Sequence, residues 1–444
     1  MKAKPLFIFG AHALLGLVLA SNKDLAFYWG IAVLVGGSVD IIFNRNANNR
    51  AGYWAAYYMG MEVFLRMTNG MLFYEFGKYG VVLLLSLGIF FEPIKKEWPR
   101  SFVFYFVLLL PSILVTAYPD AEEGRQEISF NLSGPLSLAV AVIYFYKRAL
   151  TGDDLRKLMM STLLPLAAMA IYLFLVTPKT SDVVFTTQSN FTTSGGFGPN
   201  QVSTALGLGI LLSGIALFYR YSFTGFLLAD AFLIGIFLFR GLVTFSRGGV
   251  IAAVLALAFM IILTVFSGRA GSKWISYILF FLVMASGIGY VVWDYVNEST
   301  DQLLTYRYTG VNPVNNQAED LTSNRLVILE KEWALFTNEP VLGIGPGMGK
   351  YLVSELRVNA NSHSELTRLL AEHGLFGLAS LLILVIFPYR HFKKMQPEWK
   401  PMLIAFLVLS ILTMSHSAMR LAMPGFLFGL SFIVPASKNK KKST

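Results

Sequence analysis

The sequence contains no cysteine and few charged residues. Of its 444 residues, 14% are Asp, Glu, Lys or Arg, whereas a soluble domain has about a quarter. The absence of cysteine excludes a disulfide framework and a zinc site built on thiolates. The shortage of charge, together with 55% hydrophobic residues and a mean hydropathy of +0.58, excludes an ordinary soluble domain.

Apolar runs of about 20 residues recur along the chain, and such runs fit a bilayer core about 30 Å thick. A transmembrane barrel would instead show alternating segments of roughly ten residues. We therefore predict an all-α polytopic membrane protein with 12–14 transmembrane helices. The apolar segments span residues 5–20, 25–43, 53–73, 78–92, 101–117, 127–147, 158–177, 200–219, 223–243, 247–267, 273–293, 366–388, 400–415 and 417–434.

The net charge of +10 does not indicate a nucleic-acid partner, because the basic residues lie in short connections between apolar runs. Lysines and arginines gather in every second connection, and the positive-inside rule places those connections and both termini in the cytoplasm. The chain then divides into N-terminal transmembrane helices (1–293), a large periplasmic loop (294–365), and C-terminal helices with a basic cytoplasmic tail (366–444). The apolar run after Met1 fits an uncleaved first span better than a signal peptide.

The large loop contains one helical pattern and one glycine-rich stretch. Apolar residues recur at helical spacing after Arg325, and Asn338-Glu-Pro340 ends the pattern. The stretch Gly343-Ile-Gly-Pro-Gly-Met-Gly349 resembles a dinucleotide fingerprint, but no strand precedes it. We interpret it as a glycine turn.

His363 lies at the end of this loop and is a candidate proton acceptor. The stretch Ser362-His-Ser-Glu365 matches the capping box Ser-x-x-Glu, which predicts a helix that begins at Ser362 with His363 in its first turn. The helix dipole disfavours a charged imidazole at that position, so a neutral His363 can accept a proton. The alternative is an interfacial histidine that only caps the loop.

Three charged residues follow His363 on the same predicted helix. Glu365, Arg368 and Glu372 are spaced by three and four residues, so they line one face. At the start of a membrane helix, such a stripe faces protein or water rather than lipid. The three residues either support a substrate site or form a structural ion-pair ladder.

Three arginines are candidates for phosphate binding, because the planar guanidinium fork suits phosphate oxygens. Arg247 lies at the expected outer end of a span, and Arg240 lies seven residues earlier. The alternative for both is snorkelling to the membrane interface. Arg325 begins the helix of the large loop, where a cation opposes the helix dipole unless an anion binds there. The alternative for Arg325 is a solvated loop arginine.

Further arginines fall at the outer ends of the predicted spans. Arg66 follows Glu62 by four residues, Arg125 follows an acidic turn, and Arg420 precedes the last apolar run. We expect them to bind substrate or to support the site. The acidic turn over 120–123 is more typical of a solvated turn than of a metal site, and the five histidines show no ligand spacing. No metal and no cofactor is therefore predicted.

These motifs resemble the bacterial O-antigen ligase and O-antigen polymerase superfamily of membrane glycosyltransferases. The resemblance is carried by Ser246-Arg-Gly-Gly249 at the start of a span, by the single large outer loop, and by the end of that loop. The loop ends in His363-Ser-Glu-Leu, followed by Leu-Ala-Glu372-His-Gly-Leu-Phe-Gly377. The motifs lie within residues 195–435, and the resemblance is closest to O-antigen ligase.

The resemblance implies a metal-independent, inverting glycosyltransferase that takes a glycan from undecaprenyl diphosphate at the periplasmic face of the inner membrane. A ligase of this family passes the glycan to a sugar hydroxyl of the lipid A core, and a polymerase extends another lipid-linked glycan. By motif, His363 is similar to the catalytic histidine of the family. Arg247 is similar to the arginine of its Ser-Arg-Gly-Gly motif, and Arg325 to the loop arginine that contacts the diphosphate.

We therefore expect an O-antigen ligase of lipopolysaccharide biosynthesis, with the lipid-linked glycan, the lipid A core and membrane lipids as partners. An O-antigen polymerase and a protein O-oligosaccharyltransferase are alternatives within the same superfamily. A transporter or flippase is an alternative of another class. Transporters often carry internal repeats and broken helices at mid-membrane, and this sequence shows no repeat.

Overall fold

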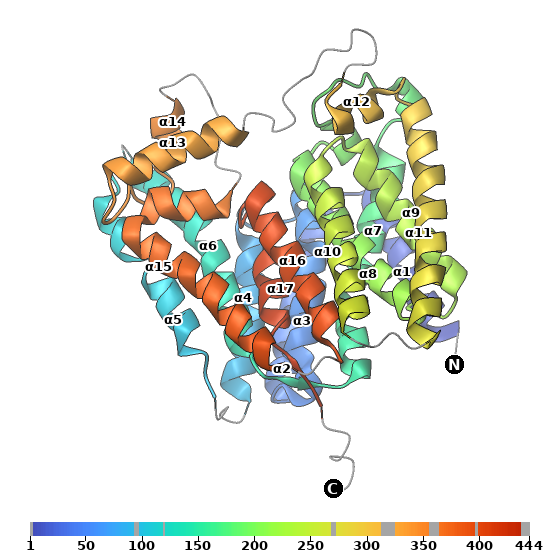
Figure 1. Ribbon diagram of the computed structural model, residues 1–444, viewed down its shortest axis with the longest axis horizontal. Coiled ribbons are helices and arrows are strands. Elements are labelled where there is room, and N and C mark those ends of the chain that lie inside the picture. Colours follow the sequence, from blue (N-terminus) through green and yellow to red (C-terminus); the bar gives the residue numbers. More distant parts are fainter. Residues whose placement is uncertain are drawn as a thin grey trace, which may run out of the picture. The chain divides into compact units, whose positions relative to one another are not determined.

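The computed structural model describes residues 3–92, 97–118, 120–267, 272–311, 325–354, 364–395 and 398–436. Within these ranges the chain is almost entirely helical (Figure 1), and the prediction of an all-α protein is confirmed. The two strands of the described part, β1 (Ala149–Leu150) and β2 (Val434–Pro435), pair in parallel.

The helices are joined by short connections in most places, as expected of membrane helices. The α-helices are α1 (Ala3–Ser21), α2 (Leu25–Phe43), α3 (Arg50–Met67), α4 (Phe76–Phe91), α5 (Arg100–Val107), α6 (Ala121–Phe145), α7 (Gly152–Val176), α8 (Pro199–Phe218), α9 (Leu227–Val243), α10 (Arg247–Phe266), α11 (Ser272–Glu298), α12 (Leu303–Thr309), α13 (Arg325–Asn338), α14 (Gly349–Ser354), α15 (Glu365–Lys394), α16 (Lys400–Ser417) and α17 (Met423–Leu430). The described connections also contain the 3-10 helices η1 (Ala47–Asn49), η2 (Pro111–Val115), η3 (Thr180–Asp182) and η4 (Thr192–Ser194).

Eight of the described helices are long and apolar enough to cross a membrane, as a multi-pass membrane protein requires. They are α2, α6, α7, α8, α10, α11, α15 and α16. Shorter apolar helices cover Pro5–Ser21, Phe76–Phe91 and Arg100–Val115. Three of the fourteen expected spans fall in neither group. The span expected over 223–243 falls on α9, which has 17 residues. The span expected over 53–73 falls on α3, where Glu62 and Arg66 reduce the hydropathy, and the span expected over 417–434 contains only the eight residues of α17.

By packing, the chain forms two compact units. Unit 1 consists of Met1–Gly36, Ala56–Leu72 and Arg156–Leu321, and unit 2 consists of Gly37–Ala55, Phe73–Leu155 and Thr322–Thr444. The large loop contributes to both, because α12 belongs to unit 1 whereas α13 and α14 belong to unit 2. Each site described below lies within one unit.

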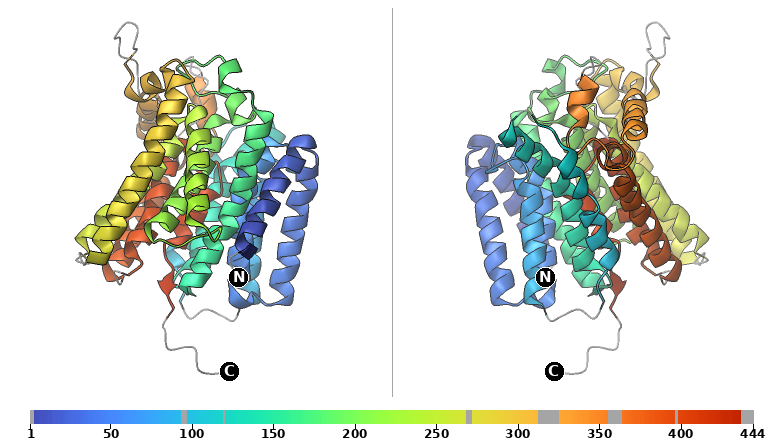
Figure 2. Two further views of the ribbon diagram at one scale, coloured as in Figure 1. Left: turned by 90° about the vertical axis from the view of Figure 1, so that its right-hand side faces the viewer. Right: turned by 90° about the vertical axis from the view of Figure 1, so that its left-hand side faces the viewer.

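In unit 1, α8 is the central helix and is buried from Gln201 to Phe218. Helices α9 and α10 pack against it, and α11 packs against α9 (Figure 2, left). Glycine permits the close crossing of α8 and α10. A Cβ atom on Gly249 would lie 2.1 Å from the carbonyl oxygen of Ser203, too near for any side chain. This contact accounts for the second glycine of the Ser246–Gly249 motif.

In unit 2, α17 packs against α6 and α16, and α13 lies against α15. Helix α15 covers the span predicted over 366–388 but changes direction at Gly374 (φ 57°, ψ −134°), as Figure 1 shows. At this kink the amide of Leu375 donates to the carbonyl of Pro340 at 2.7 Å. A Cβ atom on residue 374 would lie 2.4 Å from that carbonyl oxygen, so the kink requires glycine.

Candidate functional site

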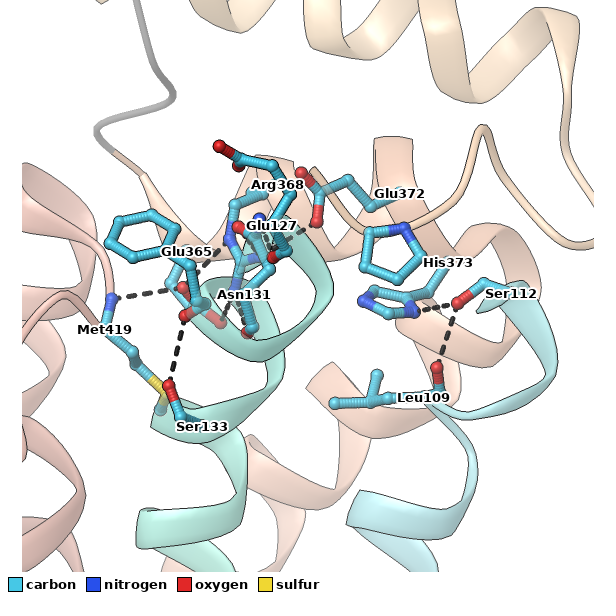
Figure 3. A network of polar contacts seen from close by, with 12 residues as sticks. Leu109, Ser112, Glu127, Asn131, Ser133, Glu365, Arg368, Glu372, His373 and Met419 are labelled. Carbon is cyan, nitrogen blue, oxygen red and sulfur yellow. Dashed lines mark hydrogen bonds and ion pairs between the residues drawn. The ribbon is translucent and has the colours of Figure 1, made fainter. Parts of the chain in front are cut away.

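Unit 2 contains a buried ionic network around Arg368 (Figure 3). Its guanidinium forms ion pairs with Glu365 at 2.6 Å and with Glu372 at 2.8 Å, as expected for three residues on one helix face. Asn131 of α6 accepts two more hydrogen bonds, through its side chain at 2.6 Å and its backbone carbonyl at 3.2 Å. With a second contact to Glu365 from Nε at 3.2 Å, all five N–H donors of Arg368 are engaged. Arg368 therefore holds two carboxylates in place rather than presenting donors to a ligand.

A polar pocket lies beside this network, formed by residues of α6, α13, α14, α15 and the segment after α16. Its ionisable lining residues are Glu127, Glu332, Lys350, Glu365, Arg368, Glu372 and Arg420. Four carboxylates thus face three cations. Carboxylates accept hydrogen bonds from hydroxyl groups and repel anions, so this lining suits a hydroxyl-rich ligand better than a phosphate.

The glycine-rich segment 343–349 borders the pocket, and its interpretation as a glycine turn is confirmed. Gly343, Gly345 and Gly347 have φ values of 71°, 91° and 79°, a backbone region that disfavours side chains. The segment is also tightly enclosed. A Cβ atom on Gly345 would lie 2.4 Å from Cγ2 of Thr116, and one on Gly347 would lie 2.4 Å from the hydroxyl of Tyr118.

Hydrogen bonds join this segment to the kink in α15. The amide of Ile344 donates to the carbonyl of Ala371 at 3.0 Å, and the amide of Gly345 donates to that of Glu372 at 3.0 Å. In a straight helix the carbonyl of Ala371 would accept from Leu375, whose amide bonds to Pro340 instead. The kink therefore supplies the acceptor that the glycine turn uses.

Two residues outside the apolar helices connect the glycine-rich segment to its surroundings. Tyr118 donates a hydrogen bond to the carbonyl of Pro346. Burial and the nearby carboxylates of Glu372 and Glu127 raise the pKa of Tyr118, so its hydroxyl remains a donor at neutral pH. Lys350 pairs with Glu127 at 2.5 Å. Burial acts to lower the pKa of Lys350, but its hydrogen bonds and charge interactions with Glu127 and Tyr351 together outweigh burial, and the pKa is raised.

A buried contact between Ser112 and His373 lies beside the network in Figure 3, and sequence reasoning missed it. Oγ of Ser112 is 2.5 Å from Nδ1 of His373 and 2.9 Å from the carbonyl oxygen of Leu109. Within the described ranges, Nε2 of His373 is buried and has no hydrogen-bond partner. The contact joins η2 to α15 immediately before the kink. No local pattern signals it, because the two residues are 261 positions apart.

His363 lies outside the described residues, so its role stays a prediction. The helix after it starts later than expected, since α15 begins at Glu365 and the N-cap residue Ser364 is extended (φ −115°, ψ 120°). The predicted capping box at Ser362, with His363 in the first turn, falls on residues outside the described ranges and stays a prediction. The carboxylate of Glu365 accepts from the guanidinium of Arg368 at 2.6 Å and from the amide of Met419 at 3.2 Å.

Arg325 is the first residue of α13 within the described ranges, and the helix ends at Asn338, as predicted. Arg325, Ile328 and Glu332 follow one another at spacings of three and four residues, so they share a face. Ile328 and Glu332 line the polar pocket, which places Arg325 one helical turn from it. The hydroxyl of Thr367 donates to Glu332 and thereby joins α15 to α13.

In unit 1, the predicted pair of Glu62 and Arg66 is present and buried. The two charged groups are 2.8 Å apart, and their side chains are only 1% and 2% exposed. Arg66 also donates to the side-chain oxygen of Gln201 at 2.8 Å, which joins α3 to the first turn of α8. Loss of Glu62 or Arg66 would leave the other buried charge without its partner. The pair therefore helps to hold α3 against α8.

Arg240 is only 3% exposed, near the end of α9. It donates to the hydroxyl of Thr177 at 2.9 Å and to the carbonyl of Thr193 at 2.7 Å, and its guanidinium lies 5.2 Å from the ring centre of Phe174. In the part of the chain that the structure describes, these partners are all neutral. Such burial excludes snorkelling to the membrane interface and agrees with a side chain that faces protein.

Arg247 is the first residue of α10 and contacts a second arginine. Its guanidinium donates to the carbonyl oxygen of Arg307 at 2.6 Å. Arg307, in α12, donates in turn to the carbonyls of Phe245 at 3.0 Å and Thr187 at 2.6 Å. The fold thus brings two arginines together that are 60 positions apart. Sequence reasoning missed Arg307, because its partners are backbone atoms that leave no pattern in the sequence.

Arg125 differs from the other predicted supporting residues. Its side chain is 71% exposed and pairs with Glu122 at 2.6 Å. The structure gathers Arg368, Glu372 and Arg420 around the pocket of unit 2, and Arg125 does not line that pocket. Among the residues described, no three His, Asp or Glu side chains are grouped so as to hold a metal ion.

Comparison with known proteins identifies one family. A family model described as O-antigen ligase matches residues 231–382, from α9 to α15. No curated protein matches the sequence. The matched region contains the Ser246–Gly249 motif, Arg325 and the end of the large loop with His363, which are the features that carried the resemblance. That resemblance is confirmed over residues 231–382, which match the O-antigen ligase family model.

Proposed function

We propose that this chain is an O-antigen ligase that transfers a glycan from undecaprenyl diphosphate to a sugar hydroxyl of the lipid A core. The family match over residues 231–382 carries the proposal, because it contains Arg247, Arg325 and His363. The apolar helices support it, since both substrates are lipid-anchored and an enzyme that joins them has to lie in the membrane.

In this reaction the leaving group is a diphosphate, so negative charge develops on phosphate oxygens. Arg247 and Arg325 each stand at the first position of a helix, where a guanidinium and the helical amides attract the same anion. We assign both to the diphosphate, with preorganised positive charge as their contribution to the rate. Arg66 and Arg240 have a supporting role, because they hold the helix ends and loops around Arg247.

His363 is assigned to the acceptor. A neutral imidazole removes the proton from the sugar hydroxyl as its oxygen attacks the anomeric carbon of the donor. One direct displacement inverts the configuration at that carbon. In this scheme the arginines supply the positive charge that a metal ion supplies in other transferases, so the reaction is proposed to be metal-independent.

The polar pocket of unit 2 supports recognition of a sugar. Its carboxylates can accept hydrogen bonds from hydroxyl groups. Its volume of about 40 Å³ admits a hydroxyl-bearing group of the glycan rather than a whole sugar ring. Arg368 keeps the carboxylates of Glu365 and Glu372 in position, and Arg420 lines the same pocket. We propose that these residues position the glycan rather than the diphosphate.

The distribution of basic residues supports a location in the bacterial inner membrane, with both termini in the cytoplasm and the site at the periplasmic face. Undecaprenyl-diphosphate glycans and the lipid A core meet at that face. The orientation can be checked by labelling single cysteines introduced at Ser181 and Glu398 from either side of the membrane, because the sequence has no cysteine of its own.

The decisive experiment is transfer by the purified protein from an undecaprenyl-diphosphate glycan. Lipid A core and a second lipid-linked glycan are offered separately, and we expect product on lipid A core. Product only on the lipid-linked glycan would identify a polymerase, and movement of donor across vesicles without a new glycosidic bond would identify a transporter. Activity retained in a chelator supports metal independence, whereas loss that a divalent ion restores would overturn it.

A further inference from the structure

Unit 1 contains an apolar groove along α10. Its floor is formed by α8 and α9, and its sides by α10 and α11. The groove follows α10 from Val250 to Ile261, a length of roughly 16 Å at 1.5 Å per residue. Its volume of about 570 Å³ is within the range of ligand pockets, roughly 300–1,000 Å³. It is therefore a recess between helices and not merely the outer face of one helix.

One end of the groove is marked by aromatic and cationic residues. Trp293 of α11 and Tyr308 of α12 line this end, with their ring centres 5.2 Å apart. Val250 is one turn from Arg247, and Tyr308 adjoins Arg307, whose carbonyl accepts the hydrogen bond from Arg247. Both guanidinium groups therefore lie beside the end at which α10 begins.

The hydroxyl of Tyr308 is an available hydrogen-bond donor at this end of the groove. Its oxygen is buried and has no hydrogen-bond partner among the described residues. Burial raises the pKa of Tyr308, while the positive charges of Arg247 and Arg307 oppose that rise, which shows that both charges act on this hydroxyl. A buried donor beside two guanidinium groups, each held by backbone carbonyls, is suited to an anionic oxygen.

We propose that this groove holds the polyisoprenyl chain of the lipid-diphosphate donor, with Arg307 and Tyr308 joining Arg247 at its phosphate end. The inference rests on the proposed function and adds the place of the lipid chain and two further donor-binding residues. Charge favours this lipid over a bilayer phospholipid. A diphosphate carries more negative charge than a single phosphodiester, and this end of the groove is lined by Tyr308, next to Arg307 in the chain and one turn of α10 from Arg247.

Two glycines of α11 provide a matched test of the chain site. Gly289 lines the groove, whereas Gly287 does not, and a Cβ atom at either position has no neighbour within 4 Å. Leucine at either position is therefore compatible with the helix, but only Gly289→Leu occupies the groove. The assay is photocrosslinking in lipid nanodiscs, with undecaprenyl diphosphate that carries a photoreactive terminal isoprene and no sugar.

We expect wild type and Gly287→Leu to crosslink on α10 and α11, and Gly289→Leu to bind this probe about tenfold more weakly, the effect of displacing roughly two methylene groups. Binding by Gly289→Leu equal to that of wild type would overturn the chain site. Equal occupancy of the groove by a photoreactive phosphatidylglycerol in competition would overturn the choice of lipid. The probe carries no sugar, so its binding does not depend on glycan transfer. If the probe binds the groove but the purified protein transfers no glycan in the transfer assay, the proposed function fails and the assignment of the groove stands.

The phosphate end is tested with Tyr308→Phe, which removes only the hydroxyl, and with Tyr306→Phe as a control in the same helix that does not line the groove. We expect Tyr308→Phe to raise the Kd for undecaprenyl diphosphate about fivefold and to leave that for undecaprenol unchanged. The same selective loss is expected of Arg307→Lys. Equal loss for both lipids would show that these residues only maintain the fold and would overturn their assignment to the phosphate.

Discussion

Arg368 in unit 2 and Arg247 in unit 1 both stand near the start of a long apolar helix, yet their guanidinium groups have different partners. Arg368 pairs with two carboxylates and an asparagine, and all its N–H donors are engaged. Arg247 donates to the backbone carbonyl of Arg307. Position along the chain groups Arg368 and Arg247 together, but the first lies in a network with two carboxylates and the second contacts another arginine.

The difference extends to the surroundings of each arginine. Arg368 borders a pocket in which carboxylates outnumber cations, whereas Arg247 lies beside Arg307 at the end of an apolar groove. A phosphate is repelled in the first environment and attracted in the second, and a sugar hydroxyl finds acceptors in the first. The pocket of unit 2 and the groove of unit 1 therefore suit ligands of different chemistry.

The largest loss of transfer activity is expected from a substitution of His363, which leaves both Arg368 and Arg247 in place. We expect His363→Ala to lower the transfer rate by about 10²–10⁴-fold, because removal of a general base costs that much. Donor binding, measured by photocrosslinking, should remain as in wild type. Asn359→Ala in the same segment is the control. Full activity of His363→Ala would show that His363 is not the general base. The residues proposed for the site would then have binding roles alone.

Arg368→Ala tests the structural side of the comparison. The substitution leaves two buried carboxylates without their cation, and breaking a buried pair in this way costs about 3–5 kcal/mol of folding free energy. We expect a clearly lower Tm in detergent, read by the fluorescence of intrinsic tryptophan. Glu372→Gln, which keeps a hydrogen-bond acceptor for Arg368, should be less damaging. An unchanged Tm in Arg368→Ala would contradict the structural role.

Arg247→Lys tests the assignment of the unit 1 arginine to an anionic group. Lysine keeps the charge but loses the planar fork, so we expect transfer to fall by about 10²-fold, as when one preorganised donor to a developing charge is lost. The Tm should stay close to that of wild type, because the contact it makes is with a backbone carbonyl. A loss of stability as large as that of Arg368→Ala, with unchanged turnover, would remove the distinction between the two arginines.

Gly345→Ala asks whether the glycine turn helps to shape the pocket of unit 2. The residue has a φ of 91°, and a Cβ atom would lie 2.4 Å from Thr116, so we expect a destabilisation of about 1–3 kcal/mol. Gly349→Ala is the control, because Gly349 begins α14 and a Cβ atom there meets nothing closer than 3.9 Å. Equal Tm values for the two variants would show that the turn is not constrained.

Arg125→Ala is expected to have the smallest effect. Arg125 is 71% exposed, its partner Glu122 is also exposed, and surface pairs of this kind contribute little. Tm and transfer should both remain within error of wild type. A drop in transfer, measured in the same assay as for Arg247→Lys, would bring Arg125 back among the substrate-binding residues.

Local patterns predicted much of the fold and part of the site. The sequence Asn338-Glu-Pro340 predicted the end of α13, and the spacing of Glu365 and Arg368 predicted their shared face. Such features depend on residues three or four apart, which a helix brings together whatever surrounds it. The long apolar runs predicted the eight described helices that are long and apolar enough to cross a membrane, because a run of about 20 apolar residues matches the bilayer core.

The contacts that the sequence did not predict join segments that are far apart along the chain. The amide of Met419, 54 positions from Glu365, donates to the carboxylate of Glu365, a contact that no local pattern predicts. The kink at Gly374 depends on a carbonyl of the large loop, and Arg307 depends on carbonyls of two other connections. None of these contacts leaves a periodic pattern or a motif in the sequence.

By itself, the sequence determined the class of protein, the helical pattern, and the superfamily, with Arg247, Arg325 and His363 as candidate residues of its site. Those conclusions rest on composition and on short motifs, which do not depend on long-range packing. Only the tertiary structure decided which arginine lies in a network with carboxylates and which lies beside another arginine. The partners of a guanidinium come from segments far apart in the chain, as Asn131 does for Arg368 and Arg307 for Arg247.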